Sequence, residues 1–256
     1  MMRAPSMPEV LIREDSEALA LAAADRLVEI GNQAVKAKDR FNLVLAGGST
    51  PQVMYQTLVS DEFRQQLDWK KVHFFWGDER CVPPDDPLSN YRMARQALLD
   101  PLAIPEENIH RMAGELEPDL AAKNYSRELQ HHFGQVEFPL FDFILLGLGQ
   151  DGHTASLFPG SRAVLEREKW VVAVEHVTPP PPLVPRITLT VPVINAAAHI
   201  LFLVSGDEKA EILGRVFQRE APDPDLPVSM IHPKRGSLTW MVDRAAAAGL
   251  TESKKS

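Results

Sequence analysis

The stretch FDFILLGLGQDGHTASLFPG (141–160) joins an unbroken apolar run to a loop rich in turn residues. The run FDFILL shows no alternation of polar and apolar residues, which is typical of a strand buried on both faces of a parallel sheet. Three glycines follow with the spacing Gly-x-Gly-x-x-Gly (147–152), and Asp151 and His153 flank the last of them. The pattern predicts a site at the end of a buried strand, either a dinucleotide cradle or a hydrolytic centre.

Apolar runs of the same kind alternate with helix-forming segments along the chain. We expect strands at 41–46, 71–79, 105–112, 141–149, 169–175, 186–194 and 198–206, and a short extended segment at 229–233. We expect helices at 15–38, 51–66, 90–99, 119–133 and 207–218. This order predicts a Rossmann-like α/β fold, with a mainly parallel sheet and helices on both faces.

Length and composition narrow the class of protein. A chain of 256 residues that is 45% hydrophobic can fill a substantial core, and we expect one domain over 1–256 with tails at 1–8 and 251–256. A formal charge of -8 disfavours a nucleic-acid partner, and no apolar run is long enough to cross a membrane. The single cysteine, Cys81, excludes an internal disulfide and fits a reducing cytoplasm.

Unusual polar stretches follow several predicted strands. They are GGSTP (47–51), GDERCVPPDD (77–86), GLGQDGH (147–153) and SGDEKA (205–210). Ligands of such sheets bind beyond the carboxyl ends of the strands, so these stretches are expected to converge. Arg186 is a further candidate, although it stands at the start of a predicted strand.

The GGSTP stretch has the features of an anion site. Gly47 and Gly48 allow the backbone to approach a ligand closely, and Ser49 and Thr50 offer hydroxyl groups. Pro51 suits the first turn of a helix, whose free N–H groups favour a phosphate. An ordinary tight turn with a helix cap is the alternative.

The DGH stretch allows two interpretations. A dinucleotide cradle needs a full helix after its third glycine, but Pro159 and Gly160 end the helix expected there after about one and a half turns. In the hydrolytic interpretation Gly152 permits a sharp turn, His153 is a general base, and N–H groups of the short helix stabilise an oxyanion. Asp151 then orients the imidazole or acts on substrate itself, and a turn with a capping histidine is the alternative.

Charged residues complete the candidate set. Asp78 can bond substrate hydroxyls and Arg80 can clamp an anion, whereas Glu79 is favoured as a solvated loop residue. Lys209 stands in the first turn of a helix, where a cation opposes the dipole and so indicates a ligand, unless neighbouring acids offset it.

Two other chemistries are disfavoured. Cys81 lacks an adjacent histidine and is expected to be a structural thiol. The histidines have no HExxH spacing, and His131 and His132 are expected to be solvated at a helix end, so no metal is expected.

Taken together, the motifs resemble the family of 6-phosphogluconolactonases and glucosamine-6-phosphate isomerases. The resemblance covers about residues 10–245 and rests on motifs that occur in order along the chain. They are LAGGSTP (45–51), FFWGDERCVPPDDPLSNYRMA (74–94), FDFILLGLGQDGHTASLFPGS (141–161), PRITLTVP (185–192) and LFLVSGDEKAEIL (201–213). The resemblance implies the fold of glucosamine-6-phosphate deaminase.

The resemblance also implies an activity: hydrolysis of 6-phospho-D-glucono-1,5-lactone to 6-phospho-D-gluconate in the oxidative pentose phosphate pathway, without a cofactor. It places His153 as the residue that activates water and Asp151 as its support. It places substrate and phosphate contacts at Gly47, Gly48, Ser49, Thr50, Asp78, Arg80, Gly152, Arg186 and Lys209. We expect a cytoplasmic protein that is a monomer or a weak homo-oligomer.

One position distinguishes this sequence from the deaminases of the family. The deaminases continue the DGH motif as GHIAFNEP, with a functional glutamate, whereas Phe158 stands at that position here. The lactonase activity is therefore favoured. A deaminase or isomerase, and a sugar-phosphate sensor without catalysis, remain open as alternatives.

Overall fold

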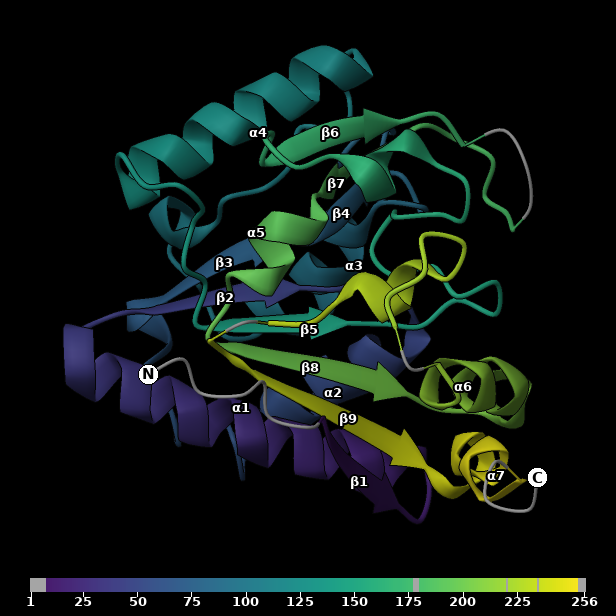
Figure 1. Cartoon of the computed structure of the whole chain (residues 1–256). Coiled ribbons are helices and arrows are strands. Elements are labelled where there is room, and N and C mark those ends of the chain that lie inside the picture. Colours follow the sequence, from purple (N-terminus) through teal and green to yellow (C-terminus); the bar gives the residue numbers. More distant parts are fainter. Residues whose placement is uncertain (1–7, 177–179, 220, 234, 253–256) are drawn as a thin grey trace.

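In a computed structural model of the chain, residues 8–176, 180–219, 221–233 and 235–252 are described (Figure 1). Six parallel strands form the main sheet in the order β1-β9-β8-β5-β2-β3. The strands are β1 (Glu9–Arg13), β2 (Phe41–Leu45), β3 (Val72–Trp76), β5 (Phe143–Leu146), β8 (His199–Val204) and β9 (Ser237–Asp243). Every residue of β2 and β5 is buried, as their mainly apolar sequences predict, and the one polar residue among them is Asn42.

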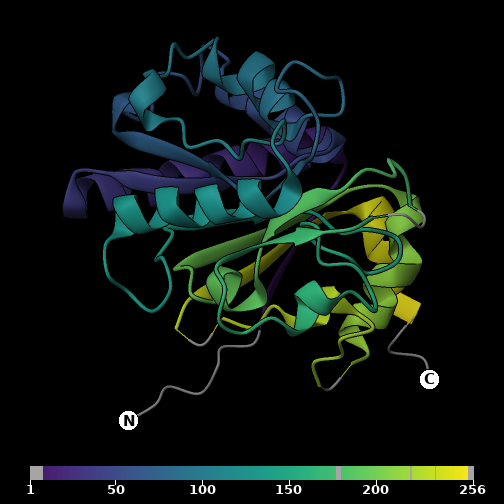
Figure 2. The ribbon, with the colours of Figure 1, turned by 90° about the horizontal axis from the view of Figure 1, so that it is seen from above.

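Helices lie on both sides of this sheet, as predicted. They are α1 (Ser16–Lys38), α2 (Ser49–Leu58), α3 (Asn90–Ala94), α4 (Pro118–Phe133), α5 (Val191–Asn195), α6 (Ala210–Phe217) and α7 (Arg244–Glu252). Figure 1 shows α1 and α2 on one side, and α4 and α5 on the other. In Figure 2 the elements from α1 to α3 lie on one side of α4, and the green and yellow elements of the second half lie on the other. The strand β1, which pairs with β9, lies with the second group.

A second, three-stranded antiparallel sheet, which the sequence analysis did not predict, lies beneath α4. Its order is β4 (Asp78–Arg80), β7 (Arg186–Leu189) and β6 (Val171–Val174). The predicted strand 71–79 is divided at Gly77: β3 belongs to the main sheet, and the chain then enters the small sheet. Because β7 runs antiparallel to β4, Arg186 at its start pairs with Arg80 at the end of β4.

Four predicted segments were wrong in part. The expected strand 186–194 ends at Leu189 and continues as α5, with Pro192 in the first turn, where its missing N–H is harmless. The helix expected over 51–66 begins at Ser49 and ends at Leu58, and turns follow it. The expected strand 105–112 contains the 3-10 turn Glu106–Asn108 and an isolated bridge between Ile109 and Phe74. The extended segment expected at 229–233 begins inside the 3-10 turn Pro227–Met230.

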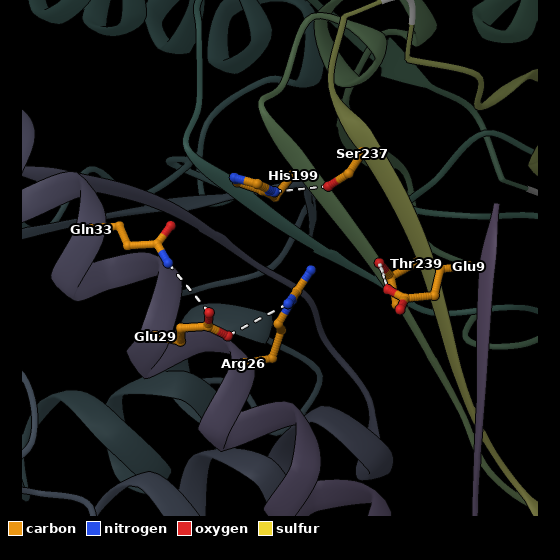
Figure 3. A network of polar contacts seen from close by, with 7 residues as sticks. All are labelled: Glu9, Arg26, Glu29, Gln33, His199, Ser237 and Thr239. Carbon is orange, nitrogen blue, oxygen red and sulfur yellow. Dashed lines mark hydrogen bonds and ion pairs between the residues drawn. The ribbon is translucent and has the colours of Figure 1, made fainter. Parts of the chain in front are cut away.

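The edge strand β1 was not predicted. It pairs with β9, and the Oγ1 of Thr239 donates a hydrogen bond of 3.2 Å to the Oε2 of Glu9 (Figure 3). The predicted tails lie mostly outside the described residues, but α7 extends to Glu252. No helix in the described part of the chain is long and apolar enough to cross a membrane.

Candidate active site

Two adjoining cavities lie at the carboxyl ends of β2, β5 and β8. The first has a volume of about 220 Å³, and the second about 490 Å³. The first is lined by residues that include Gly47, Gly48, Asp78, Arg80, His153, Arg186 and Lys209. The second is lined by residues that include Gly48, Ser49, Thr50, Gly206, Glu208 and Lys209. The structure therefore brings the predicted stretches together in one cleft, with Lys209 bordering both cavities.

Asp151 fixes the orientation of the His153 ring through a contact with its Nδ1. Its Oδ1 lies 2.5 Å from the Nδ1 of His153 and also accepts a hydrogen bond of 3.1 Å from the His153 backbone N–H. Burial of the Asp151 carboxyl opposes its ionisation, but the contacts with His153 outweigh burial and lower its pKa. An ionised carboxylate at Nδ1 stabilises the tautomer with a proton on Nδ1, which leaves the Nε2 lone pair available as a base.

The glycines around this pair are required by close contacts. Gly152 has φ of 86°, in the left-handed region, and a Cβ there would lie 2.4 Å from the Cδ1 of Leu226. A Cβ on Gly149 would lie 2.1 Å from the Nδ1 of His153. The Gly149 N–H also donates to the His153 carbonyl at 2.9 Å. The turn thus packs tightly around His153, and residues larger than glycine do not fit at positions 149 and 152.

The short helix expected after His153 does not form, so this part of the hydrolytic interpretation was wrong. Residues 154–157 form a tight turn closed by a bridge between Thr154 and Leu157. The Thr154 hydroxyl donates to the Gly147 carbonyl at 2.9 Å. Helix-start N–H groups are therefore not available at this position to stabilise an oxyanion.

Phe158 packs against the ring of His153, and His176 packs on Phe158. The ring centre of Phe158 lies 4.6 Å from that of His153 and 4.0 Å from that of His176, on which it is stacked. His176 is buried and its Nε2 lies 2.6 Å from the Pro180 carbonyl. The sequence indicates Phe158 only as a departure from the deaminases, and His176 stands in none of the motifs.

Asp78 lies in the cleft, held by two buried side chains that the sequence analysis missed. The Ser156 hydroxyl donates to its Oδ2 at 2.5 Å, and the Asn90 amide lies 3.3 Å from its Oδ1 and 3.0 Å from its carbonyl oxygen. Asn90 in turn requires Gly47, because a Cβ on Gly47 would lie 1.9 Å from its Oδ1. Ser156 and Asn90 both stand inside the family motifs, which was the available signal for them.

Glu79 is not a solvated loop residue, contrary to the expectation. It is 2% exposed and accepts hydrogen bonds from the Ser89 hydroxyl and from the backbone N–H groups of Arg80, Asn90 and Tyr91. Burial raises the pKa of the Glu79 carboxyl above its ordinary value, although these hydrogen bonds act to lower it. Its carboxyl organises the start of α3 and does not face the cleft.

Two arginines stand side by side at the edge of the small sheet. Arg186 is 5% exposed, and backbone carbonyls of Val184 and Pro182 accept its hydrogen bonds at 3.2 and 2.9 Å. Arg80 donates to the Leu88 carbonyl at 2.6 Å. Within the described ranges neither forms an ion pair with a carboxylate, although Asp78 is near Arg186. Burial, and to a smaller degree Arg80, lower the pKa of Arg186. Held cations of this kind favour an anionic ligand.

The start of α2 presents a second feature that attracts anions. Gly48 is the N-cap residue with φ of 105°, and no side chain caps the helix. The first N–H groups at Ser49 and Thr50 therefore border the cleft without a side-chain acceptor, and they favour negative charge. Lys209 ends a 3-10 turn (Asp207–Lys209) directly before α6, where the sequence predicts the first turn of one helix over 207–218.

Cys81 is half-buried and free. Burial is the main cause that raises the pKa of its thiol to about 11, with Glu79 acting in the same direction. A thiol with so high a pKa is a poor nucleophile, which agrees with the structural role expected from the sequence.

Comparisons with known proteins agree on one family. The family model described as "Glucosamine-6-phosphate isomerases/6-phosphogluconolactonase" matches residues 14–240. The 6-phosphogluconolactonase of Nostoc sp. is 40% identical over 245 residues, covering 94% of this chain and 98% of the relative. That of Synechocystis sp. is 43% identical over 222 residues, covering 85% of this chain and 88% of the relative.

Solved structures show the same architecture. The 6-phosphogluconolactonase of Trypanosoma cruzi has a TM-score of 0.85 at 31% identity, covering 98% of this chain and 100% of that chain. A monomeric glucosamine-6-phosphate deaminase has a TM-score of 0.78 at 23% identity, covering 94% of this chain and 99% of that chain. The latter likeness shows the shared fold alone.

Proposed function

Because the chain belongs to the glucosamine-6-phosphate isomerase/6-phosphogluconolactonase family, we propose that it hydrolyses 6-phospho-D-glucono-1,5-lactone to 6-phospho-D-gluconate in the oxidative pentose phosphate pathway. The observation that carries the proposal is the Asp151–His153 pair, which stands in the same cleft as three cationic side chains. A base and a cationic cleft are what hydrolysis of a phosphorylated lactone needs.

In this proposal His153 is the general base. Its Nε2 takes a proton from a water molecule while the water oxygen attacks the lactone carbonyl carbon. The tetrahedral intermediate then collapses, the bond from that carbon to the ring oxygen breaks, and the imidazolium returns its proton to the departing oxygen. The new carboxylic acid loses its proton to solvent. Asp151 keeps Nδ1 protonated throughout and stabilises the transient imidazolium.

The phosphate and sugar contacts follow from the charges and N–H groups of the cleft. The phosphate dianion lies where the start of α2 meets Lys209, with Arg186 and Arg80 adding positive charge. Ser49 and Thr50 add hydroxyl donors to the same anion. Asp78, held by Ser156 and Asn90, accepts a hydrogen bond from a sugar hydroxyl. Gly47, Gly48 and Gly152 act through the backbone.

The identity of residue 158 supports hydrolysis over deamination. Phe158 is 7% exposed and packs between the rings of His153 and His176. A carboxylate for proton transfer to a sugar carbon is therefore absent at this described position. We further propose a single domain that works in the cytoplasm without a cofactor, as a monomer or a weak homo-oligomer.

The test is turnover of freshly generated 6-phosphogluconolactone, corrected for spontaneous ring opening. The proposal predicts hydrolysis well above the background and much slower hydrolysis of unphosphorylated gluconolactone. It also predicts no ammonia release from glucosamine 6-phosphate. Ammonia release without lactone hydrolysis would favour the deaminase alternative, and tight binding without either reaction would favour a sensor.

A further inference from the structure

Three histidines that are far apart in the sequence meet at the end of β3 opposite to the cleft. His73 is the second residue of β3, His110 follows the 3-10 turn Glu106–Asn108, and His132 lies in the last turn of α4. One ring nitrogen from each lies within 4.8 Å of those from the other two. We call these three residues the histidine cluster.

The spacing within the cluster suits a metal ion. The Nδ1 of His73 lies 3.2 Å from the Nε2 of His110. Two ligands about 2.0–2.1 Å from a tetrahedral zinc ion are about 3.3 Å apart, so this pair needs almost no movement. His132 completes a set of three, with its ring centre 4.8 Å from that of His73 and 4.9 Å from that of His110.

Outer partners orient two of the three rings. The Oε1 of Glu128 lies 2.8 Å from the Nδ1 of His110, which is the nitrogen that points away from His73. The Oδ1 of Asn42 lies 3.0 Å from the Nε2 of His132. Metal-binding histidines commonly donate their second N–H to a carboxylate or carbonyl oxygen, and these contacts have that form.

Aromatic packing partly shields the cluster from solvent. Phe75 is stacked on His110 with 4.4 Å between ring centres, and its ring centre lies 5.1 Å from that of His132. All three histidines are partly buried. A metal ion binds the unprotonated nitrogen of an imidazole, so binding at this cluster requires neutral rings.

We propose that His73, His110 and His132 form a binding site for one divalent transition-metal ion such as Zn²⁺, with Glu128 and Asn42 as outer partners. Three neutral nitrogen ligands and one water molecule make a common zinc coordination set. The ion would tie β3, the segment before α4 and the end of α4 together, away from the cleft. The expectation that His132 is solvated at the helix end was wrong, because its ring is partly buried against Phe75 and contacts Asn42. The sequence did not indicate the cluster, because no short spacing connects the three positions.

The test is metal binding by chelator-treated full-length protein. Every variant carries His153→Gln, so that the imidazole of the cleft does not contribute. Zn²⁺ is titrated by calorimetry, and Co²⁺ is titrated while the visible absorption typical of tetrahedral cobalt is recorded. We compare this background with His110→Gln, and with His131→Gln as the matched control, because His131 is exposed and adjoins the cluster.

The background protein and the His131→Gln control should each bind one equivalent and show the cobalt absorption. His110→Gln should lose the absorption and bind at least about tenfold more weakly. Circular dichroism without metal checks folding, and His132→Gln is used if His110→Gln does not fold. In a second readout, Zn²⁺ should raise the Tm of the control and not that of the cluster variant. Equal binding and equal Tm shifts in all the proteins, or none in any, would overturn the proposal.

Discussion

The ring of Phe158 packs against the imidazole of His153, with 4.6 Å between ring centres and 43° between ring planes. The imidazole of His153 is thus fixed by two contacts, the Phe158 ring and the Asp151 carboxylate at its Nδ1. A side chain that acts through His153 in this way is a positioning residue.

Replacement of Phe158 by leucine should therefore lower kcat about tenfold, because the ring of His153 loses its support. KM should rise by a smaller factor, because the guanidinium of Arg186 lies 5.9 Å from the Phe158 ring centre and loses this contact. Steady-state kinetics measure both parameters. Phe217→Leu is a matched control, because that ring packs on Trp240 away from the cleft. An equal fall of kcat in both variants would show that the effect is not specific to His153.

Asp151→Asn should lower kcat about a hundredfold or more with a small change in KM, because the amide no longer stabilises the tautomer and the imidazolium. The same change at Asp85, an exposed residue of the nearby loop, should leave kcat within about twofold of the wild type. Retention of most of the activity by Asp151→Asn would exclude Asp151 as the partner of the base.

The lowered pKa of Asp151 also predicts how stability depends on pH. A carboxyl whose pKa is lower in the folded state stabilises the fold above its unfolded pKa, and that contribution is lost as the pH falls through the folded pKa. The difference in unfolding free energy between wild type and Asp151→Asn should shrink as the pH falls below about 4. Urea unfolding at a series of pH values measures it, and a difference that grows on acidification would contradict the assignment.

Gly149→Ala should reduce kcat strongly, because the added methyl would lie 2.1 Å from the Nδ1 of His153 and 2.7 Å from the Oδ1 of Asp151. The pair must separate or the turn must shift. Gly147→Ala is the control for stability, since a methyl there meets no atom within 4 Å and should leave the Tm unchanged. Full activity of Gly149→Ala would mean that the close contact with His153 does not limit the reaction.

Lys209→Met should raise KM for the phosphorylated lactone about tenfold to a hundredfold, because one charge-assisted hydrogen bond to the phosphate is lost. The rate with unphosphorylated gluconolactone should hardly change. Lys71→Met is the control, because Lys71 pairs with Asp39 at 2.8 Å, outside the cleft. If Lys209→Met slowed both substrates equally, Lys209 would act on the lactone ring and not on the phosphate.

The parallel sheet was predictable because its strands carry their own signal. FILL is a short unbroken apolar run and FNLVL is apolar except for Asn42, and each is followed by a glycine-rich turn. Parallel strands end at a common edge, so the polar stretches at 47–51, 77–86, 147–153 and 205–210 were expected to meet there. The geometry of the cleft follows from that rule.

What the sequence did not indicate depends on partners distant in the chain. Nothing in GDER shows that it leaves the main sheet and pairs with RITL, and the burial of Glu79 follows from that pairing and from the start of α3. In RITLTVPVI the apolar pattern is the same for a strand and for a short buried helix, and Pro192 decides between them. The cluster of His73, His110 and His132 exists only through packing of β3 against α4 and the segment before it.

The central claim is that His153 activates water for opening of a phosphorylated lactone. The most direct measurement is the initial rate of 6-phosphogluconolactone hydrolysis by wild type, by His153→Ala and by the exposed-site control His131→Ala, each corrected for spontaneous opening. The account predicts a loss of about a hundredfold to ten-thousandfold in folded His153→Ala and an unchanged rate in His131→Ala. A folded His153→Ala that hydrolyses the lactone at the wild-type rate would contradict it.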